Sequence, residues 1–186
     1  MIHVSQGASS SVDKTSTDFE PGDTTLDEFD VRPGDILGSD EGAYARAVSI
    51  LDPTGDIGHT QEVLPDKVGE LQILTSDSGG QRVAGVGDPA VSGRGYVVYR
   101  PRTTPYLGGR PGQPPGLVDW VSANASGGGL GRYLGNWGGN VCSSTCNSAL
   151  QAGGINTGFA SGTFVTPNQL ARSPALLRVG RLPLIP

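Results

Sequence analysis

Three short stretches in the middle of the chain decide its predicted fold: Ile57-Gly-His-Thr-Gln-Glu-Val-Leu64, Glu70-Leu-Gln-Ile-Leu-Thr-Ser76 and Gln81-Arg-Val-Ala-Gly-Val86. Each stretch has the length of a strand, and Pro-Asp and Ser-Gly-Gly turn signals separate it from the next. Strands that are joined by such short connections pair in the antiparallel sense. We therefore expect an antiparallel meander over residues 57–86.

Regular elements are also predicted on both sides of this meander. On the N-terminal side, a Pro-Gly turn precedes a short strand within residues 31–37, and residues 41–51 carry apolar side chains at helical spacing. On the C-terminal side, a strand is predicted over residues 96–100 and a loop rich in proline and glycine over residues 101–116. Two helices are predicted over residues 117–125 and 142–152. A short helix that begins after Thr166 (residues 166–170) and a last strand (residues 176–184) follow. A second break, rich in glycine, is expected over residues 127–139.

Length and composition indicate one folded domain. The chain has 186 residues, which fits a single core. Residues 1–28 are acidic, rich in Ser and Thr, and poor in apolar side chains, so we expect a flexible or loosely docked arm, with the folded domain over residues 29–186. The net charge of −5 without a basic cluster argues against a nucleic-acid partner. No apolar run is long enough for a signal peptide or a transmembrane segment, which predicts synthesis in the cytoplasm.

Cys142 is the candidate nucleophile. It begins the predicted helix 142–152, where unpaired amides and the helix dipole favour a thiolate, and the glycine-rich stretch before it is expected to leave the sulfur open to solvent. Cys146 lies one turn further, in an apolar row with Ala149 and Leu150, which predicts a structural role. Both cysteines are expected to be free thiols. A C-x-x-x-C pair with one distant histidine lacks the ligands of a zinc site, and we expect no metal or other cofactor.

His59 is the candidate base for this thiol. The chain has two histidines, and His3 lies in the predicted arm, so His59 is the plausible imidazole to pair with Cys142. Asp35, which follows a Pro-Gly turn, is predicted to cap backbone amides rather than to act in catalysis.

The order of three motifs resembles the circularly permuted NlpC-type papain-like cysteine hydrolases, which are peptidoglycan amidases and endopeptidases. The motifs are Arg32-Pro-Gly-Asp-Ile-Leu37, Gly58-His59 and Cys142-Ser143. The resemblance spans about residues 29–184 and implies an α+β fold in which a small antiparallel sheet packs against helices. Thr60-Gln-Glu62 departs from the small and apolar residues usual there, which suggests an edge strand or an unusual cleft wall.

The same resemblance implies a third residue, on the strand after that of His59, which orients the imidazole. Strand alternation places Thr75 nearest to that position, with Asp77 two residues further along the same face. A carboxylate binds an imidazole N–H more strongly than a hydroxyl does, so chemistry favours Asp77 while register favours Thr75. The sequence leaves this choice open.

The function implied by the resemblance is cleavage of an amide bond, with peptidoglycan peptides as the expected substrate. The missing signal peptide favours an antibacterial effector or a lysis enzyme, exported by a specialised secretion system to the periplasm of a target cell. A cognate immunity protein or a secretion-system carrier is the expected protein partner. Two alternatives stay open: a lipid acyl hydrolase or acyltransferase with the same nucleophile, and a binding module without activity.

Overall fold

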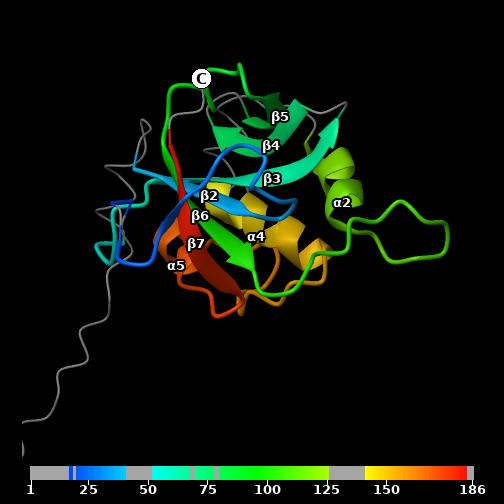
Figure 1. Ribbon diagram of the computed structural model, residues 1–186. Helices are drawn as coiled ribbons and strands as arrows, with labels where there is room; N and C mark the ends of the chain where they lie inside the picture. Colours follow the sequence, from blue (N-terminus) through cyan, green and yellow to red (C-terminus); the bar gives the residue numbers. More distant parts are fainter. Residues whose placement is uncertain are drawn as a thin grey trace, which may run out of the picture.

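A single seven-stranded sheet forms the centre of the molecule, in the order β1-β7-β6-β2-β3-β4-β5 (Figure 1). The computed structural model of the chain describes residues 17–18, 20–40, 52–67, 70–77, 80–125 and 141–183. The strands are β1 (Thr24–Thr25), β2 (Ile36–Ser39), β3 (His59–Lys67), β4 (Glu70–Asp77), β5 (Gly80–Gly85), β6 (Tyr96–Pro101) and β7 (Leu176–Leu182). The described helices are α2 (Leu117–Asn124), α4 (Cys142–Ala152) and α5 (Pro167–Ala171).

The predicted fold class is wrong. We expected a small antiparallel sheet packed against helices in the papain-like manner, whereas the sheet is large and mixed, and the described helices are three and short. The sheet is mixed because β1 pairs with β7 in parallel, while all other neighbours pair antiparallel. Frequent prolines and glycines limit the length of the helices, so extended segments dominate the described structure.

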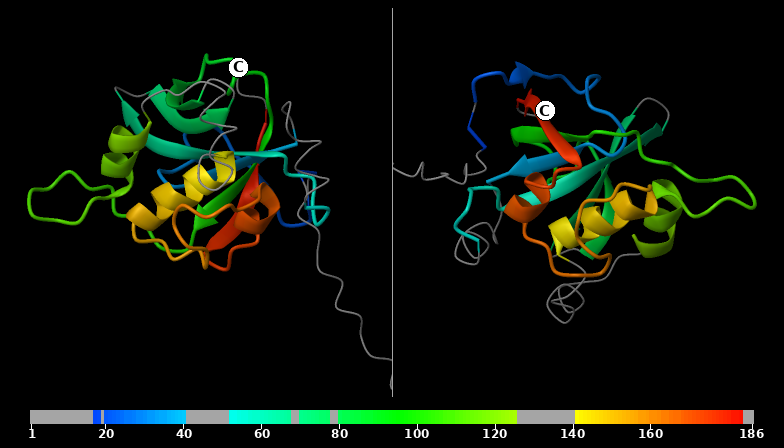
Figure 2. Two further views of the ribbon diagram at one scale, coloured as in Figure 1. Left: turned by 180° about the vertical axis from the view of Figure 1, so that it is seen from behind. Right: turned by 90° about the horizontal axis from the view of Figure 1, so that it is seen from below.

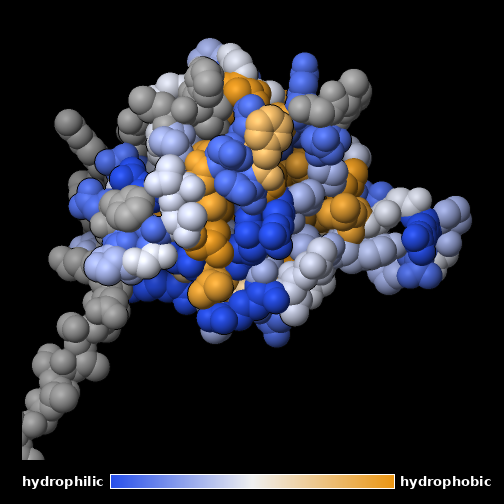
Figure 3. Space-filling model, in the orientation of Figure 1, coloured by the Kyte–Doolittle hydropathy of each residue, from blue (hydrophilic) through white to orange (hydrophobic). Residues whose placement is uncertain are grey.

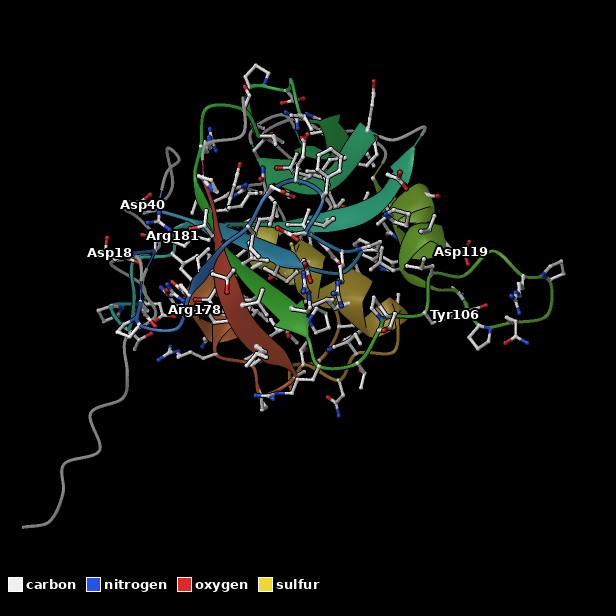
Figure 4. All side chains as sticks on the ribbon, in the orientation of Figure 1. Asp18, Asp40, Tyr106, Asp119, Arg178 and Arg181 are labelled. Carbon is white, nitrogen blue, oxygen red and sulfur yellow. The ribbon has the colours of Figure 1, made fainter. Side chains whose placement is uncertain are left out.

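The N-terminal segment joins this sheet, so the predicted boundary at residue 29 is too late. Leu26 is buried, and Arg178 of β7 binds Asp23 at 2.6 Å and Glu20 at 3.1 Å. Asp18 and Arg178 lie on the same side of the molecule, and the backbone carbonyl of Asp18 also accepts from that guanidinium (Figure 4). Residues 20–26 are therefore fixed to the sheet by an ion-pair network. Residues 1–16 lie outside the described part.

The predicted local elements are largely confirmed. The meander appears as β3, β4 and β5, and the predicted helices 117–125 and 142–152 appear as α2 and α4. The Gly153-Gly154 pair ends α4, and Thr166 caps α5 with Pro167 at its first position. The predicted helix 41–51 and the predicted glycine-rich break 127–139 lie outside the described residues.

Helix α4 lies across one face of the sheet (Figure 2). Residues 142–150 are all buried, because the sheet covers one side of the helix and residues 155–166 run along the other. Leu150 packs against Ile36 of β2 and Val97 of β6 in one apolar cluster. This burial fixes the first turn of α4 against the start of β3.

Strand β3 is a central strand, which corrects the prediction of an edge or a cleft wall for Thr60-Gln-Glu62. It pairs with β2 on one side and β4 on the other. Gln61 and Glu62 are both 0% exposed. These polar side chains therefore lie inside the protein.

The visible surface in the orientation of Figure 1 is mixed, with hydrophobic patches separated by hydrophilic residues (Figure 3). Among the described residues, Phe29 and Leu177 are exposed large apolar side chains. In the part of the chain that the structure describes, no helix combines the length and the apolar character that a membrane crossing requires.

Candidate active site

The first turn of α4 positions Cys142. The helix begins at this residue, after Val141 in an extended conformation, and no acidic side chain occurs in its first turn. The first amides of a helix have no partner within it, so they and the helix dipole favour a negative charge at this end. Ser143 donates to the carbonyl of Val165, and the amide of Val165 donates to Ser144 at 3.0 Å. These bonds hold the first turn in place.

The segment before β3 positions His59. The amide of Ile57 donates to the side-chain carbonyl of Asn168 at 3.2 Å, and the amide of Gly58 donates to the carbonyl of Ser39 at 2.8 Å. Asn168 is fully buried in α5 and Ile57 in the core. The backbone on which His59 stands is therefore tied to α5 and to β2.

Cys142 and His59, which are far apart in the sequence, meet at this point. The imidazole makes a hydrogen bond with the sulfur, and the backbone N–H of Thr60 donates to the same sulfur. Burial raises the pKa of the Cys142 thiol, but the charge and hydrogen bond of His59, together with Thr60, outweigh burial and lower this pKa to about 7. A thiol with this pKa is substantially ionised at neutral pH.

Cys146 has the opposite environment one helical turn further along. It belongs to the apolar cluster around Leu150, as predicted. Burial raises the pKa of its thiol well above the ordinary value, and the nearby Glu62 carboxyl raises it further. Both cysteines are free, and the pKa of the Cys146 thiol is raised where that of the Cys142 thiol is lowered.

The sulfur of Cys142 is less accessible than predicted. Its side chain is 4% exposed, whereas we expected open access for solvent. His59 is partly exposed, so solvent contacts the pair on the imidazole side. The glycine-rich stretch that was expected to open the approach lies outside the described residues.

Neither predicted orienting residue is hydrogen-bonded to the imidazole in the described structure. Thr75 is buried in β4, and its hydroxyl accepts from the side-chain amide of Gln61 at 3.0 Å. The Asp77 carboxylate lies 3.3 Å from the guanidinium of Arg82. Direct pairing of β3 with β4 starts only at Glu62, opposite Leu74, so both candidates lie beyond the paired section.

Sequence reasoning missed a group of buried polar atoms around this pair. The hydroxyl of Ser39, the amide oxygen of Gln61 and both carboxyl oxygens of Glu62 are buried without a hydrogen-bond partner. Burial raises the pKa of the Glu62 carboxyl well above its usual range. The signal available in the sequence was the polar run Thr60-Gln-Glu62 within a predicted strand. Polar residues are rarely buried without a structural or functional reason.

Asp35 has the structural role that was predicted. It is fully buried, accepts from the amide of Arg32 at 2.9 Å, and forms an ion pair with Arg100 at 2.7 Å. Asp35 precedes the first residue of β2, whereas His59 pairs with Ser39 at the last, so this ion pair and the Cys–His pair lie at opposite ends of the strand.

Comparisons with known proteins do not assign the chain. No protein-family model matches it, and no curated protein matches it. Within the described ranges, no group of three or more His, Cys, Asp or Glu side chains is arranged to hold a metal ion. The Cys142–His59 pair is therefore the feature from which a function is argued.

Proposed function

We propose that the protein is a cysteine hydrolase that cleaves amide bonds, with Cys142 as nucleophile and His59 as base. The observation that carries the proposal is the hydrogen-bonded pair of sulfur and imidazole at the first residue of α4. The lowered pKa of one buried thiol, beside a second thiol whose pKa is raised, is the pattern expected of a nucleophile.

The reaction has two steps in this proposal. The Cys142 thiolate adds to the amide carbonyl and forms a C–S bond, and the protonated His59 gives its proton to the amine as the C–N bond breaks. Water then loses a proton to His59 and adds to the thioester, and the C–S bond breaks to release the acid. Unpaired amides at the start of α4 are the donors available to the oxyanion.

The substrate class rests on the sequence resemblance. The motifs at Arg32, Gly58-His59 and Cys142 support peptidoglycan peptides as substrate and an antibacterial effector or lysis enzyme as the biological role. Export by a specialised secretion system, and a cognate immunity protein or a carrier as partner, belong to the same proposal.

The test uses the purified full chain on two substrates. Incubation with peptidoglycan sacculi is expected to release peptides that mass spectrometry identifies, and Cys142→Ala should release none. Cys146→Ala is the matched control, because it removes the other thiol of the same helix and should retain activity. Parallel incubation with phospholipid vesicles tests for released fatty acid. Fatty acid without peptides, or no product from a folded protein, would contradict the proposal.

A further inference from the structure

The imidazole of His59 requires a partner on its second ring nitrogen if it is to act as a base. A histidine that serves a nucleophile presents one nitrogen to it, and a bond to the other nitrogen fixes the tautomer and the ring orientation. The sequence predicted Thr75 or Asp77, both of which lie in β4, as this partner. In the structure, Gln61 bonds the Thr75 hydroxyl and Arg82 binds the Asp77 carboxylate.

The strand on the other side of His59 offers a different residue. Strands β2 and β3 pair without interruption from Ile36 opposite Glu62 to Ser39 opposite His59. Directly opposite residues of an antiparallel pair stand on the same face, with Cβ atoms roughly 5 Å apart. Ser39 is therefore the cross-strand neighbour of the imidazole.

The Ser39 side chain is also unusual in itself. It is 0% exposed, and its hydroxyl makes no hydrogen bond. A buried hydroxyl without a hydrogen bond destabilises the folded state, so its presence calls for an explanation. The hydroxyl can turn about a single bond between three staggered positions without any movement of the backbone.

From these observations we infer that Ser39 is the positioning residue of the Cys–His pair. Its hydroxyl accepts the N–H of the His59 ring nitrogen that faces away from Cys142, and so holds the other nitrogen toward the sulfur. This inference rests on the proposed function, and it replaces a partner from β4 with one from β2. It also accounts for the unbonded hydroxyl, whose partner is the ring in the reactive orientation.

The experiment measures the rate of Cys142 alkylation by iodoacetamide as a function of pH, which needs no substrate. Ser39→Ala should reduce the rate at pH 7 by about tenfold and move the midpoint of the profile to higher pH, as expected when a supporting hydrogen bond is lost. Thr75→Val and Asp77→Asn, compared in the same assay, should change the rate less than about threefold. The midpoint of unfolding of Ser39→Ala in urea should stay close to that of the wild type, because the variant leaves the backbone pairing of β2 with β3 intact.

The outcomes separate the two proposals. A wild-type profile without a midpoint near pH 7 would refute the thiolate, and with it the proposed function. A normal wild-type profile that is unchanged in Ser39→Ala would refute the role of Ser39 alone. If Asp77→Asn or Thr75→Val lowered the rate of Cys142 alkylation more than Ser39→Ala does, the positioning residue would lie on β4 instead. Lower stability of Ser39→Ala with an unchanged profile would show a merely structural role.

Discussion

Cys142 and Cys146 lie one turn apart on the same helix and are both buried, yet their thiols have opposite acidities. Burial raises the pKa of each. Beside Cys142, however, stand His59 and the amide of Thr60, while Cys146 has the Glu62 carboxyl and the apolar cluster around Leu150. The difference shows that the imidazole beside Cys142, rather than the depth of burial, decides which thiol ionises.

Removal of the reactive thiol is expected to have the largest effect on activity. Cys142→Ala should abolish amide hydrolysis, because no other described thiol has an imidazole beside it. Assays on sacculi, with far-ultraviolet circular dichroism to verify folding, check this expectation. Residual hydrolysis above the level of a reaction without protein would contradict the assignment of the nucleophile.

Removal of the imidazole should make Cys142 resemble Cys146. In His59→Ala, burial is no longer offset by a cation, so the pKa of the Cys142 thiol should rise above its ordinary value of about 8.5. Hydrolysis should fall by about 10²- to 10⁴-fold. The midpoint of the alkylation profile of Cys142 measures the first effect, with His3→Ala as the matched control. A midpoint that stays near 7 would show that the helix alone lowers the pKa.

Glu62, whose carboxyl lies near Cys146, gives another test of the comparison between the two thiols. Its pKa is raised by burial, so the folded state keeps a proton that the unfolded chain releases above about pH 4.3. Stability therefore falls as pH rises from that value toward the raised pKa of the folded state. Glu62→Gln, which cannot ionise, should remove this dependence.

Glu62→Leu should increase the free energy of unfolding at pH 8 by about 1–3 kcal/mol, because it removes a buried group without a partner. Urea denaturation of both variants and the wild type at pH 4.5 and pH 8 measures these effects. Destabilisation of Glu62→Leu at pH 8 would mean that the carboxyl makes favourable interactions in the folded state.

The smallest effect is expected at Cys146. Cys146→Ala leaves the His59 side of the site untouched and removes one buried sulfur, so stability should fall by about 1 kcal/mol. The alkylation midpoint of Cys142 should change little. A loss of hydrolysis in this folded variant would give Cys146 a chemical role that the comparison denies.

Elements with local signals could be predicted from the sequence. Gly153-Gly154 ends α4, and Pro167 after Thr166 starts α5, because these residues act through their own backbone conformations. The meander followed in the same way from its turns. The start of α4 at Cys142 was likewise readable from the chain, and His59 lies beside this residue as predicted.

Non-local pairing could not be predicted in this way. Strand β1 is two residues long and carries no strand pattern. It nevertheless pairs in parallel with β7, which lies more than 150 residues further along the sequence. Its place depends on the Asp23–Arg178 ion pair, which no local pattern indicates. The fold class was wrong partly for this reason.

The partner of the imidazole was misplaced for a related reason. Alternation along β4 puts Thr75 and Asp77 on one face, but it does not say where the pairing of β3 with β4 begins. Likewise, Glu62 was assigned to an edge because a polar residue in a strand usually faces solvent. Only the strand order places it in the core.

The most direct test of the central claim is the titration of both thiols in one folded protein. Iodoacetamide is applied in short pulses from pH 5 to pH 10, and mass spectrometry of the peptides quantifies each cysteine separately. The account predicts a midpoint near 7 for Cys142, with Cys146 unmodified until the protein unfolds. Equal midpoints for the two thiols, or modification of Cys146 before Cys142, would contradict it.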